Sequence, residues 1–293
     1  MQIIKTSQIL TPAMLLIKKE GKKVGFVPTM GALHEGHVSL MRMAKMGNDV
    51  LVVSIFVNPA QFNDPNDLAK YPRPIENDIS LLEQAGCDIL YLPEVDDVYP
   101  VGMEATRFVK NPTGVVFNFG GLEKRLEGAS RPGHFAGVAQ VVNILLQTVL
   151  PDVLYLGQKD YQQFLILKKM VEFLDLKLQV IRCPIIRENN GLAMSSRNVR
   201  LSDELRIKAG GIYATLNYAA SLLHVLPIAE IETSCLDALN ALDDFVVDYF
   251  EILDADTLDE AQAATQQLVI ITSVIVGGVR LLDNLVVEKI TPF

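Results

Sequence analysis

The first two-thirds of the chain alternates short runs of β-branched and apolar residues with segments of helical periodicity. This alternation is typical of a parallel β-sheet covered by helices, because parallel strands need long crossover connections. The expected strands are residues 24–29, 50–57, 87–93, 151–157 and 178–186, the last of them a buried strand. The expected helices between them are residues 36–47, 75–86, 133–150 and 160–174. The sequence therefore predicts an α/β fold with a Rossmann-like, doubly wound parallel sheet.

The pattern changes after the last of these strands. A polar turn at residues 187–191 precedes an expected helix from Asp203 to His224. Apolar runs at residues 249–254 and 268–276 then predict antiparallel strands. We therefore expect two domains, a Rossmann-like domain of residues 1–185 and a smaller C-terminal α+β domain of residues 186–293.

Composition excludes several classes of function. The formal net charge of -9 provides no positive field to collect a polyanion, so a nucleic-acid partner is not expected. Charged and turn residues interrupt the apolar stretches well before the length that a membrane span requires, so we expect a soluble, cytoplasmic protein with no membrane partner. Cys87, Cys183 and Cys235 form no C-x-x-C pair and are expected to be ordinary, partly buried thiols.

Residues 30–37, MGALHEGH, connect the first expected strand to the first expected helix. Gly31 and Gly36 allow the backbone to turn and to approach a ligand closely. The helix N-terminus offers unpaired N–H groups to phosphate oxygens. His34 and His37 lie three residues apart at the same place, where each imidazole can donate to a phosphate. The segment is therefore a candidate phosphate-binding loop.

Two other interpretations of this loop compete with phosphate binding. A zinc site needs about three protein ligands, and the segment lacks the H-E-x-x-H spacing that places two imidazoles on one helix face. A purely structural turn is the second alternative. Phosphate binding is favoured over both because glycines, imidazoles and a helix N-terminus coincide there.

A strand followed by H-x-G-H is typical of the nucleotidyl-transferase superfamily, and the longer string PTMGALHEGH at residues 28–37 resembles the pantothenate synthetase family. Other segments match that family in the same order along nearly the whole chain. They are NPAQF (58–62), KYPR (70–73), RLEGASRPGHFAGV (125–138), GQKDYQQ (157–163), MSSRN (194–198), YFEILD (249–254) and GGVRLLDN (277–284).

The resemblance implies an ATP-dependent ligase that uses Mg²⁺. In that family the pantoate carboxylate attacks the α-phosphorus of ATP and expels pyrophosphate. β-Alanine then attacks the pantoyl-adenylate to give pantothenate and AMP. The resemblance also implies a homodimer formed through the N-terminal domain, and a C-terminal domain that acts as a lid over the nucleotide. The first domain would then bind both nucleotide and substrate.

The resemblance also implies roles for individual residues. The catalytic groups are His34, His37, Lys159 and Arg197, all of which place donors or positive charge on phosphate oxygens. Gln61, Gln163 and Met30 are expected to bind pantoate, and Asp160 to bind Mg²⁺. The residues expected around ATP are Met30, Gly31, Ala32, Leu33, His34, Glu35, Gly36, His37, Gly157, Gln158, Lys159, Asp160, Ile186, Met194, Ser195, Ser196 and Arg197.

One position departs from the family pattern, because the usual G-E-K-D is G-Q-K-D here, with Gln158 in place of a glutamate.

The main alternative function is another adenylyl transferase of the superfamily that acts on a mononucleotide. An aminoacyl-tRNA synthetase fragment is disfavoured, since MSSR lacks the lysines of its K-M-S-K-S loop and the chain is acidic. His134 is expected either to assist binding or to cap its helix, and His224 to pack or lie on the surface.

Overall fold

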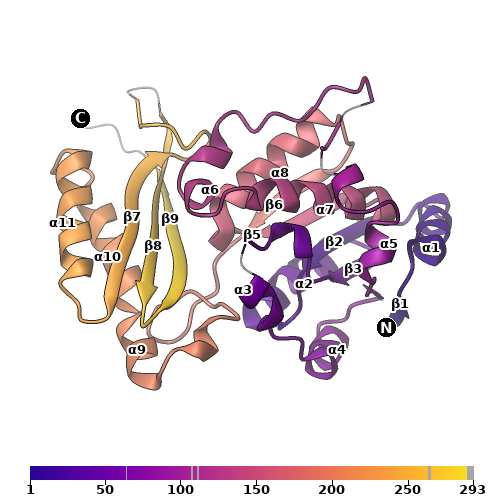
Figure 1. The fold of residues 1–293 in the computed structure, drawn as a ribbon, viewed down its shortest axis with the longest axis horizontal. Helices are drawn as coiled ribbons and strands as arrows, with labels where there is room; N and C mark the ends of the chain where they lie inside the picture. Colours follow the sequence, from indigo (N-terminus) through magenta and orange to yellow (C-terminus); the bar gives the residue numbers. More distant parts are fainter. Residues whose placement is uncertain (64, 107, 111, 263–264, 289–293) are drawn as a thin grey trace. The chain divides into compact units, whose positions relative to one another are not determined.

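The computed structural model describes residues 1–63, 65–106, 108–110, 112–262 and 265–288. The chain divides into two compact units (Figure 1). The first contains residues 1–157 and 162–183, and the second contains residues 158–161 together with the chain from Pro184 onward.

The first unit is built on a sheet of six parallel strands in the order β1-β4-β3-β2-β5-β6. The strands are β1 (Gln2–Ile4), β2 (Val24–Thr29), β3 (Val50–Ile55), β4 (Ile89–Tyr91), β5 (Val153–Gly157) and β6 (Gln179–Cys183). From β2 the chain moves outward to β3 and β4, and it later returns to the other side of β2 as β5. The strand order therefore reverses between β2 and β5, which is where doubly wound sheets bind ligands at the carboxyl ends of their strands.

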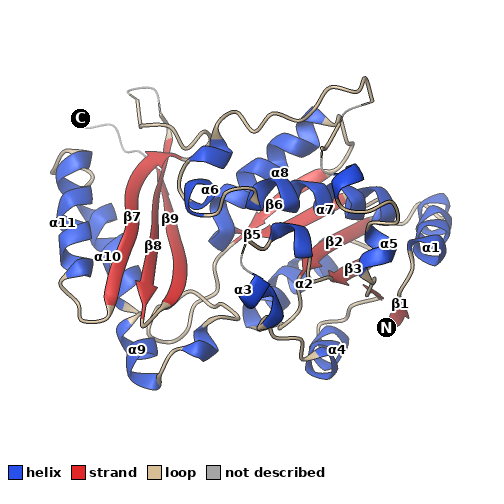
Figure 2. Cartoon of the chain, viewed as in Figure 1, coloured by secondary structure: helices blue, strands red, loops and turns tan. Residues whose placement is uncertain are grey.

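Helices cover this sheet (Figure 2). The longer ones are α1 (Ser7–Lys19), α2 (Glu35–Gly47), α4 (Ile75–Gln84), α7 (His134–Val149) and α8 (Tyr161–Phe173), and the short ones are α3 (Pro65–Ala69), α5 (Val95–Val98) and α6 (Glu127–Ser130). Met41 of α2 and Leu82 of α4 pack with Leu51 and Val53 of β3 on one face. Val52, between those two strand residues, faces the opposite side and is also fully buried. Burial on both faces explains why β3 is apolar at every position except Ser54.

Most of the predicted elements of this unit are confirmed within a few residues, including the strands at residues 24–29 and 50–57 and the helix at 133–150. Two predictions need correction. The strand at 24–29 is the second of the chain, because the three-residue strand β1 and helix α1 precede it. The strand at 178–186 is shorter than expected and lies at the sheet edge, where only Cys183 is fully buried.

The second unit contains a three-stranded antiparallel sheet of β7 (Phe245–Asp254), β8 (Gln267–Val276) and β9 (Val279–Glu288). Gly277 and Gly278 join β8 to β9, and both have positive φ, as a two-residue hairpin of the primed type requires. Helices α10 (Gly211–Leu222) and α11 (Ile228–Asn240) pack on the sheet, and α9 (Asp203–Lys208) precedes them. The predicted α+β class of this region is confirmed.

The helical stretch expected from Asp203 to His224 is confirmed as helical, but the chain interrupts it after Lys208 and so divides it into α9 and α10. A Cβ added at Gly210 would lie 2.3 Å from the carbonyl oxygen of Asn190, so this loop approaches the backbone too closely for a larger residue. The Asn190 side chain also donates to the carbonyl of Arg206 at 2.7 Å, near the end of α9. Helix α11 and strand β9 were not predicted.

Candidate active site

The loop between β2 and α2 carries both histidines of the H-x-G-H segment. His34 is the N-cap of α2, with extended backbone, and its Nδ1 accepts from the Gly36 N–H at 3.1 Å. The Nδ1 of His37 accepts from the His34 N–H at 3.3 Å, which completes a reciprocal capping box. The two ring centroids are 4.1 Å apart. The structure therefore brings these two predicted catalytic residues together at the helix N-terminus.

The capping box also determines which nitrogen of each ring can donate. Because Nδ1 accepts a backbone hydrogen bond in both rings, a neutral imidazole must carry its proton on Nε2. Nε2 is then the donor that each ring can direct toward a ligand. The positive end of the α2 dipole lies at the same place and favours an anion there. Glu35, the first residue of α2, forms an ion pair with Arg42.

The backbone of this loop is held by Asp78, which sequence reasoning missed. Its buried carboxylate accepts from the N–H groups of Ala32 at 2.9 Å and Leu33 at 2.7 Å. Gly31 and Ala32 both have positive φ, and a Cβ at Gly31 would lie 2.9 Å from Asp78 Oδ2. The available signal was an aspartate on the apolar face of α4, between Ile75 and Leu82 at helical spacing.

Replacing Asp78 with asparagine is expected to destabilise the protein by about 1–3 kcal/mol at neutral pH, because an amide cannot accept both N–H groups. Burial raises the pKa of Asp78, and the hydrogen bonds from Leu33 and Ala32 oppose the increase. The folded state therefore binds this proton more tightly than the unfolded state, so ionisation reduces wild-type stability as pH rises toward the raised pKa. Urea unfolding at a series of acidic pH values should show that the difference in free energy of unfolding between the wild type and Asp78→Asn becomes smaller as pH increases. A difference that becomes larger with increasing pH would contradict a raised pKa for Asp78.

Gln61, the expected pantoate ligand after β3, is buried at the end of a short 3₁₀ helix, Pro59–Gln61. Its Nε2 lies 3.0 Å from the Met30 sulfur, so the structure brings these two predicted substrate residues together. Asn58 orients the carboxamide by donating to Gln61 Oε1 at 3.2 Å. Asn58 in turn accepts from the Tyr99 hydroxyl at 2.7 Å. Asn58 and Tyr99 are therefore positioning residues that the sequence did not identify.

His134 is buried at the start of α7, where both of its ring nitrogens make polar contacts. Its Nε2 lies 3.2 Å from an Arg131 nitrogen and its Nδ1 lies 2.9 Å from the Gln61 carbonyl oxygen. Because arginine can only donate, Nε2 accepts and Nδ1–H donates to that carbonyl. His134 thus donates a hydrogen bond to the backbone of Gln61. His224 lies exposed after α10.

Gln163 lies half-buried in the first turn of α8. Its neighbour Gln162 is buried, accepts from the Glu127 N–H at 3.1 Å and donates to the carbonyls of Leu122 and Arg125. Gln162 therefore fastens the segment at residues 122–127 to α8. Helix α8 follows β5, the strand that pairs with β2 in the sheet.

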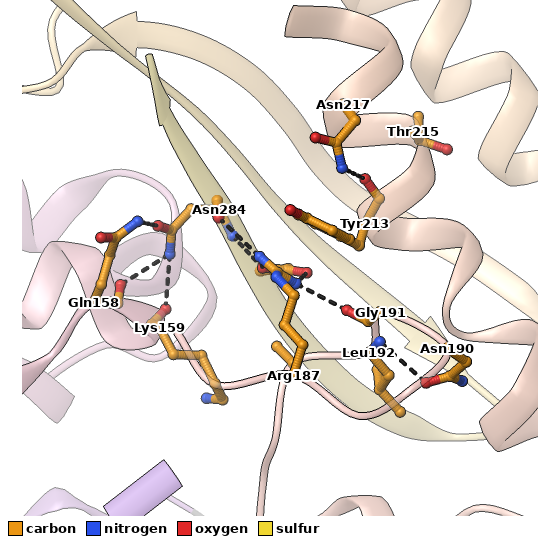
Figure 3. Close-up of polar contacts among 12 residues, drawn as sticks. Gln158, Lys159, Arg187, Asn190, Gly191, Leu192, Tyr213, Thr215, Asn217 and Asn284 are labelled. Atoms are coloured by element: carbon orange, nitrogen blue, oxygen red, sulfur yellow. Dashed lines mark hydrogen bonds and ion pairs between the residues drawn. The ribbon is translucent and has the colours of Figure 1, made fainter. Parts of the chain in front are cut away.

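Lys159 and Asp160 belong to the second unit, in a short 3₁₀ helix, Gln158–Asp160, that follows Gly157 of β5 directly. Lys159 Nζ lies 3.4 Å from Asp160 Oδ1, and half of the Asp160 side chain is exposed. The side chain of Gln158 donates to Asn284 Oδ1 at 3.2 Å (Figure 3). The residue that departs from the family pattern is thus engaged with β9.

The Met194–Arg197 segment of the second unit is half-buried and held by its own backbone. The Met194 N–H donates to the Ile186 carbonyl at 2.9 Å, which pairs the two sides of the turn. The Arg197 N–H donates to Ser195 Oγ at 3.2 Å. Ser196 lies between them in the same turn. This arrangement leaves a compact loop of two hydroxyls and a guanidinium in one unit with Lys159.

Other features limit the chemistry of the described residues. All three cysteines are free and buried, and burial raises the pKa of Cys183 and of Cys235 to about 11, so neither is a nucleophile near neutral pH. Among residues 1–288 that are described, no group of three histidine, cysteine or acidic side chains is arranged to hold a metal. None of the helices in the described ranges has the length and apolar character needed to cross a bilayer.

Comparison with known proteins identifies the family. A family model described as pantoate-beta-alanine ligase matches residues 2–286. A protein named pantothenate synthetase from Azobacteroides pseudotrichonymphae is 41% identical over 289 residues, which cover 97% of this chain and 99% of that protein. The crystal structure of a pantothenate synthetase from Thermus thermophilus is 39% identical with a TM-score of 0.88, covering 97% and 99% of the two chains.

A further solved structure, pantoate-beta-alanine ligase from Francisella tularensis complexed with beta-gamma ATP and beta-alanine, is 35% identical. Its TM-score is 0.77, and the match covers 97% of both chains. The likeness to these structures extends over both units, which agrees with the order of sequence segments along the whole chain. This chain belongs to the pantoate-beta-alanine ligase family.

Proposed function

We propose that this chain catalyses the ATP-dependent condensation of pantoate with β-alanine to pantothenate, AMP and pyrophosphate, through a pantoyl-adenylate. The observation that carries the proposal is the reciprocal cap of His34 and His37 at the N-terminus of α2, at the carboxyl end of β2. It supports a phosphate-binding site at the place where the strand order reverses. A family relative complexed with beta-gamma ATP and beta-alanine adds support for both ligands.

Adenylation brings two anions together and increases the charge on the phosphate oxygens, so the site needs preorganised donors. The Nε2–H groups of His34 and His37 supply two of them, with the α2 N-terminus behind them. Lys159 adds a point charge, and Ser195, Ser196 and Arg197 add further donors; all four residues belong to the second unit. The pantoate carboxylate then attacks the α-phosphorus, and pyrophosphate leaves.

Gln61 and Met30 form a small site with one amide and one thioether, which suits the hydroxyls and methyl groups of pantoate. Gln163 is proposed as a further contact from α8. In the second step the neutral amine of β-alanine attacks the acyl carbon and AMP leaves. Partial desolvation near Gln61 favours the uncharged amine.

Mg²⁺ typically binds one or two carboxylates together with substrate phosphates, and the half-exposed Asp160 beside Lys159 fits such a site. When bound, the ion would neutralise charge on the pyrophosphate oxygens. We further propose a homodimer, which gel filtration with light scattering would test, and a lid function for the second unit, which small-angle scattering with and without ATP and pantoate would test.

The proposed reaction is tested by measuring pyrophosphate release from purified protein with ATP and Mg²⁺. Pantoate alone should produce no more than about one equivalent, because the adenylate stays bound, and pantoate with β-alanine should produce many turnovers. Mononucleotides serve as the competing substrates. Release that requires a mononucleotide instead of pantoate would overturn the proposal in favour of an adenylyl transferase.

A further inference from the structure

Asn284 joins strand β9 to the segment that contains Lys159 (Figure 3). The side chain is buried, with 1% of its residue surface exposed. Its Nδ2 donates to the carbonyl oxygens of Gln158 at 2.9 Å and Lys159 at 3.0 Å, while its Oδ1 accepts from Gln158 Nε2 at 3.2 Å. One carboxamide thus makes three hydrogen bonds to two consecutive residues of the 3₁₀ helix.

Asn284 is itself fixed by a buried ion pair between Arg187 and Asp283. The guanidinium donates to both Asp283 oxygens, at 2.6 and 2.9 Å, in the bidentate geometry that arginine favours. Asp283 Oδ1 also accepts from the Asn284 N–H at 2.7 Å. The guanidinium lies 3.5 Å from the ring centroid of Tyr213, which limits its movement. Burial raises the pKa of Asp283, and Arg187 and Lys159 oppose the increase, so both cations are within electrostatic reach of it.

Arg187 also contacts the chain segment that leads into the Ser195–Arg197 loop. Arg187 Nη1 donates to the Gly191 carbonyl at 3.0 Å, and residues 187 and 193 form an isolated antiparallel bridge. Met194 follows that bridge directly. Two separate segments with phosphate-binding groups, at residues 158–160 and 194–197, are therefore tied to one frame of Arg187, Asp283 and Asn284.

We propose that Asn284 is a positioning residue for the adenylation step, which holds Lys159 at a fixed place relative to the Ser195–Arg197 loop. The inference rests on the proposed function, since it assigns Lys159 to the phosphates of ATP. Asn284 touches no reacting atom and acts through the main chain of Gln158 and Lys159. Gln158 contributes because its amide, unlike a carboxylate, can donate to Asn284 Oδ1 while Asn284 Nδ2 donates to the backbone.

The test is single-turnover pyrophosphate release with ATP, Mg²⁺ and pantoate, combined with a double-mutant cycle. Asn284→Ala is expected to lower the rate constant by about 10²-fold, because small displacements of a charged group cost that much. In the Lys159→Ala background the same substitution should change the rate by less than about twofold, since two residues that act as a unit are not additive. Asn284→Ser serves as the second variant if the alanine variant folds poorly, and it should also slow the reaction, by at least about tenfold, because one hydroxyl cannot donate to both carbonyls.

Asn217→Ala is the matched control, because this asparagine lies in the same unit and donates to a single helix carbonyl, that of Tyr213, at 2.8 Å (Figure 3). It should retain the wild-type rate. Rates are compared well below each variant's melting temperature, so that only folded protein is measured. The inference fails if Asn284→Ala or Asn284→Ser retains the wild-type rate. It also fails if either substitution lowers the rate of the Lys159→Ala protein by the same factor as it lowers the rate of the wild type, because Asn284 would then act independently of Lys159. If the wild type releases no pyrophosphate with pantoate, the proposed function fails instead.

Discussion

Substitution of His37 with alanine is expected to lower pantoate-dependent pyrophosphate release by about 10²–10³-fold, the typical cost of removing one preorganised donor to a developing anion. The ring is held by the His34 N–H at 3.3 Å, so Nε2–H is its donor toward ligand. The long capping bond contributes little to folding, and the melting temperature should therefore change little. Steady-state and single-turnover pyrophosphate assays, with thermal unfolding in parallel, provide the measurement.

His34→Ala is the informative comparison, because His34 also caps α2 through its bond to the Gly36 N–H. Loss of an N-cap typically costs about 1 kcal/mol, so this variant should lose stability as well as activity. His224→Ala, at an exposed position, should change neither. If His37→Ala retains wild-type release, or loses activity only in proportion to unfolding, the assignment of His37 as a phosphate donor is wrong.

Short-range patterns in the sequence were sufficient to predict the parallel sheet and the placement of the H-x-G-H segment, because strand alternation and helical spacing are local properties. The elements missed are those whose local signal is weak. Strand β1 has only three residues, and the break between α9 and α10 lies where Asn190, distant in sequence, approaches Gly210. The edge position of β6 follows from strand order, which no local pattern encodes.

The candidate site shows the same limit. His34 and His37 are neighbours in sequence, so their pairing could be predicted. Asp78 and Asn284 reach their partners across 45 and 125 residues, so only the fold brings these groups together. Residues 158–161 belong to the second unit, and Asn284 of β9 binds the backbone of two of them, Gln158 and Lys159.

Gly137→Ala is expected to lower kcat/KM for pantoate by about 10²-fold, although the residue touches no ligand atom in the proposed site. Gly137 lies inside α7, where a Cβ would meet the Ala60 carbonyl oxygen at 2.3 Å and the Gln61 nitrogen at 2.8 Å. Its own carbonyl accepts from Asn58 at 3.1 Å. The added methyl group must therefore displace the turn that carries Gln61.

Two opposing effects determine the stability of this variant. Alanine is preferred over glycine inside a helix by about 1 kcal/mol, whereas overpacking a rigid contact costs about 1–3 kcal/mol. Because the contacted atoms at Ala60 and Gln61 are backbone, the clash should outweigh the helix preference and lower the melting temperature by a few degrees. Gly211→Ala is the matched control, since a Cβ there meets only Leu242 at an ordinary 3.7 Å. If the Gly137→Ala protein is destabilised but retains the wild-type kcat/KM for pantoate, the turn at Ala60 does not position Gln61 for the substrate. A lower kcat/KM for pantoate with unchanged kinetics for ATP would support that role.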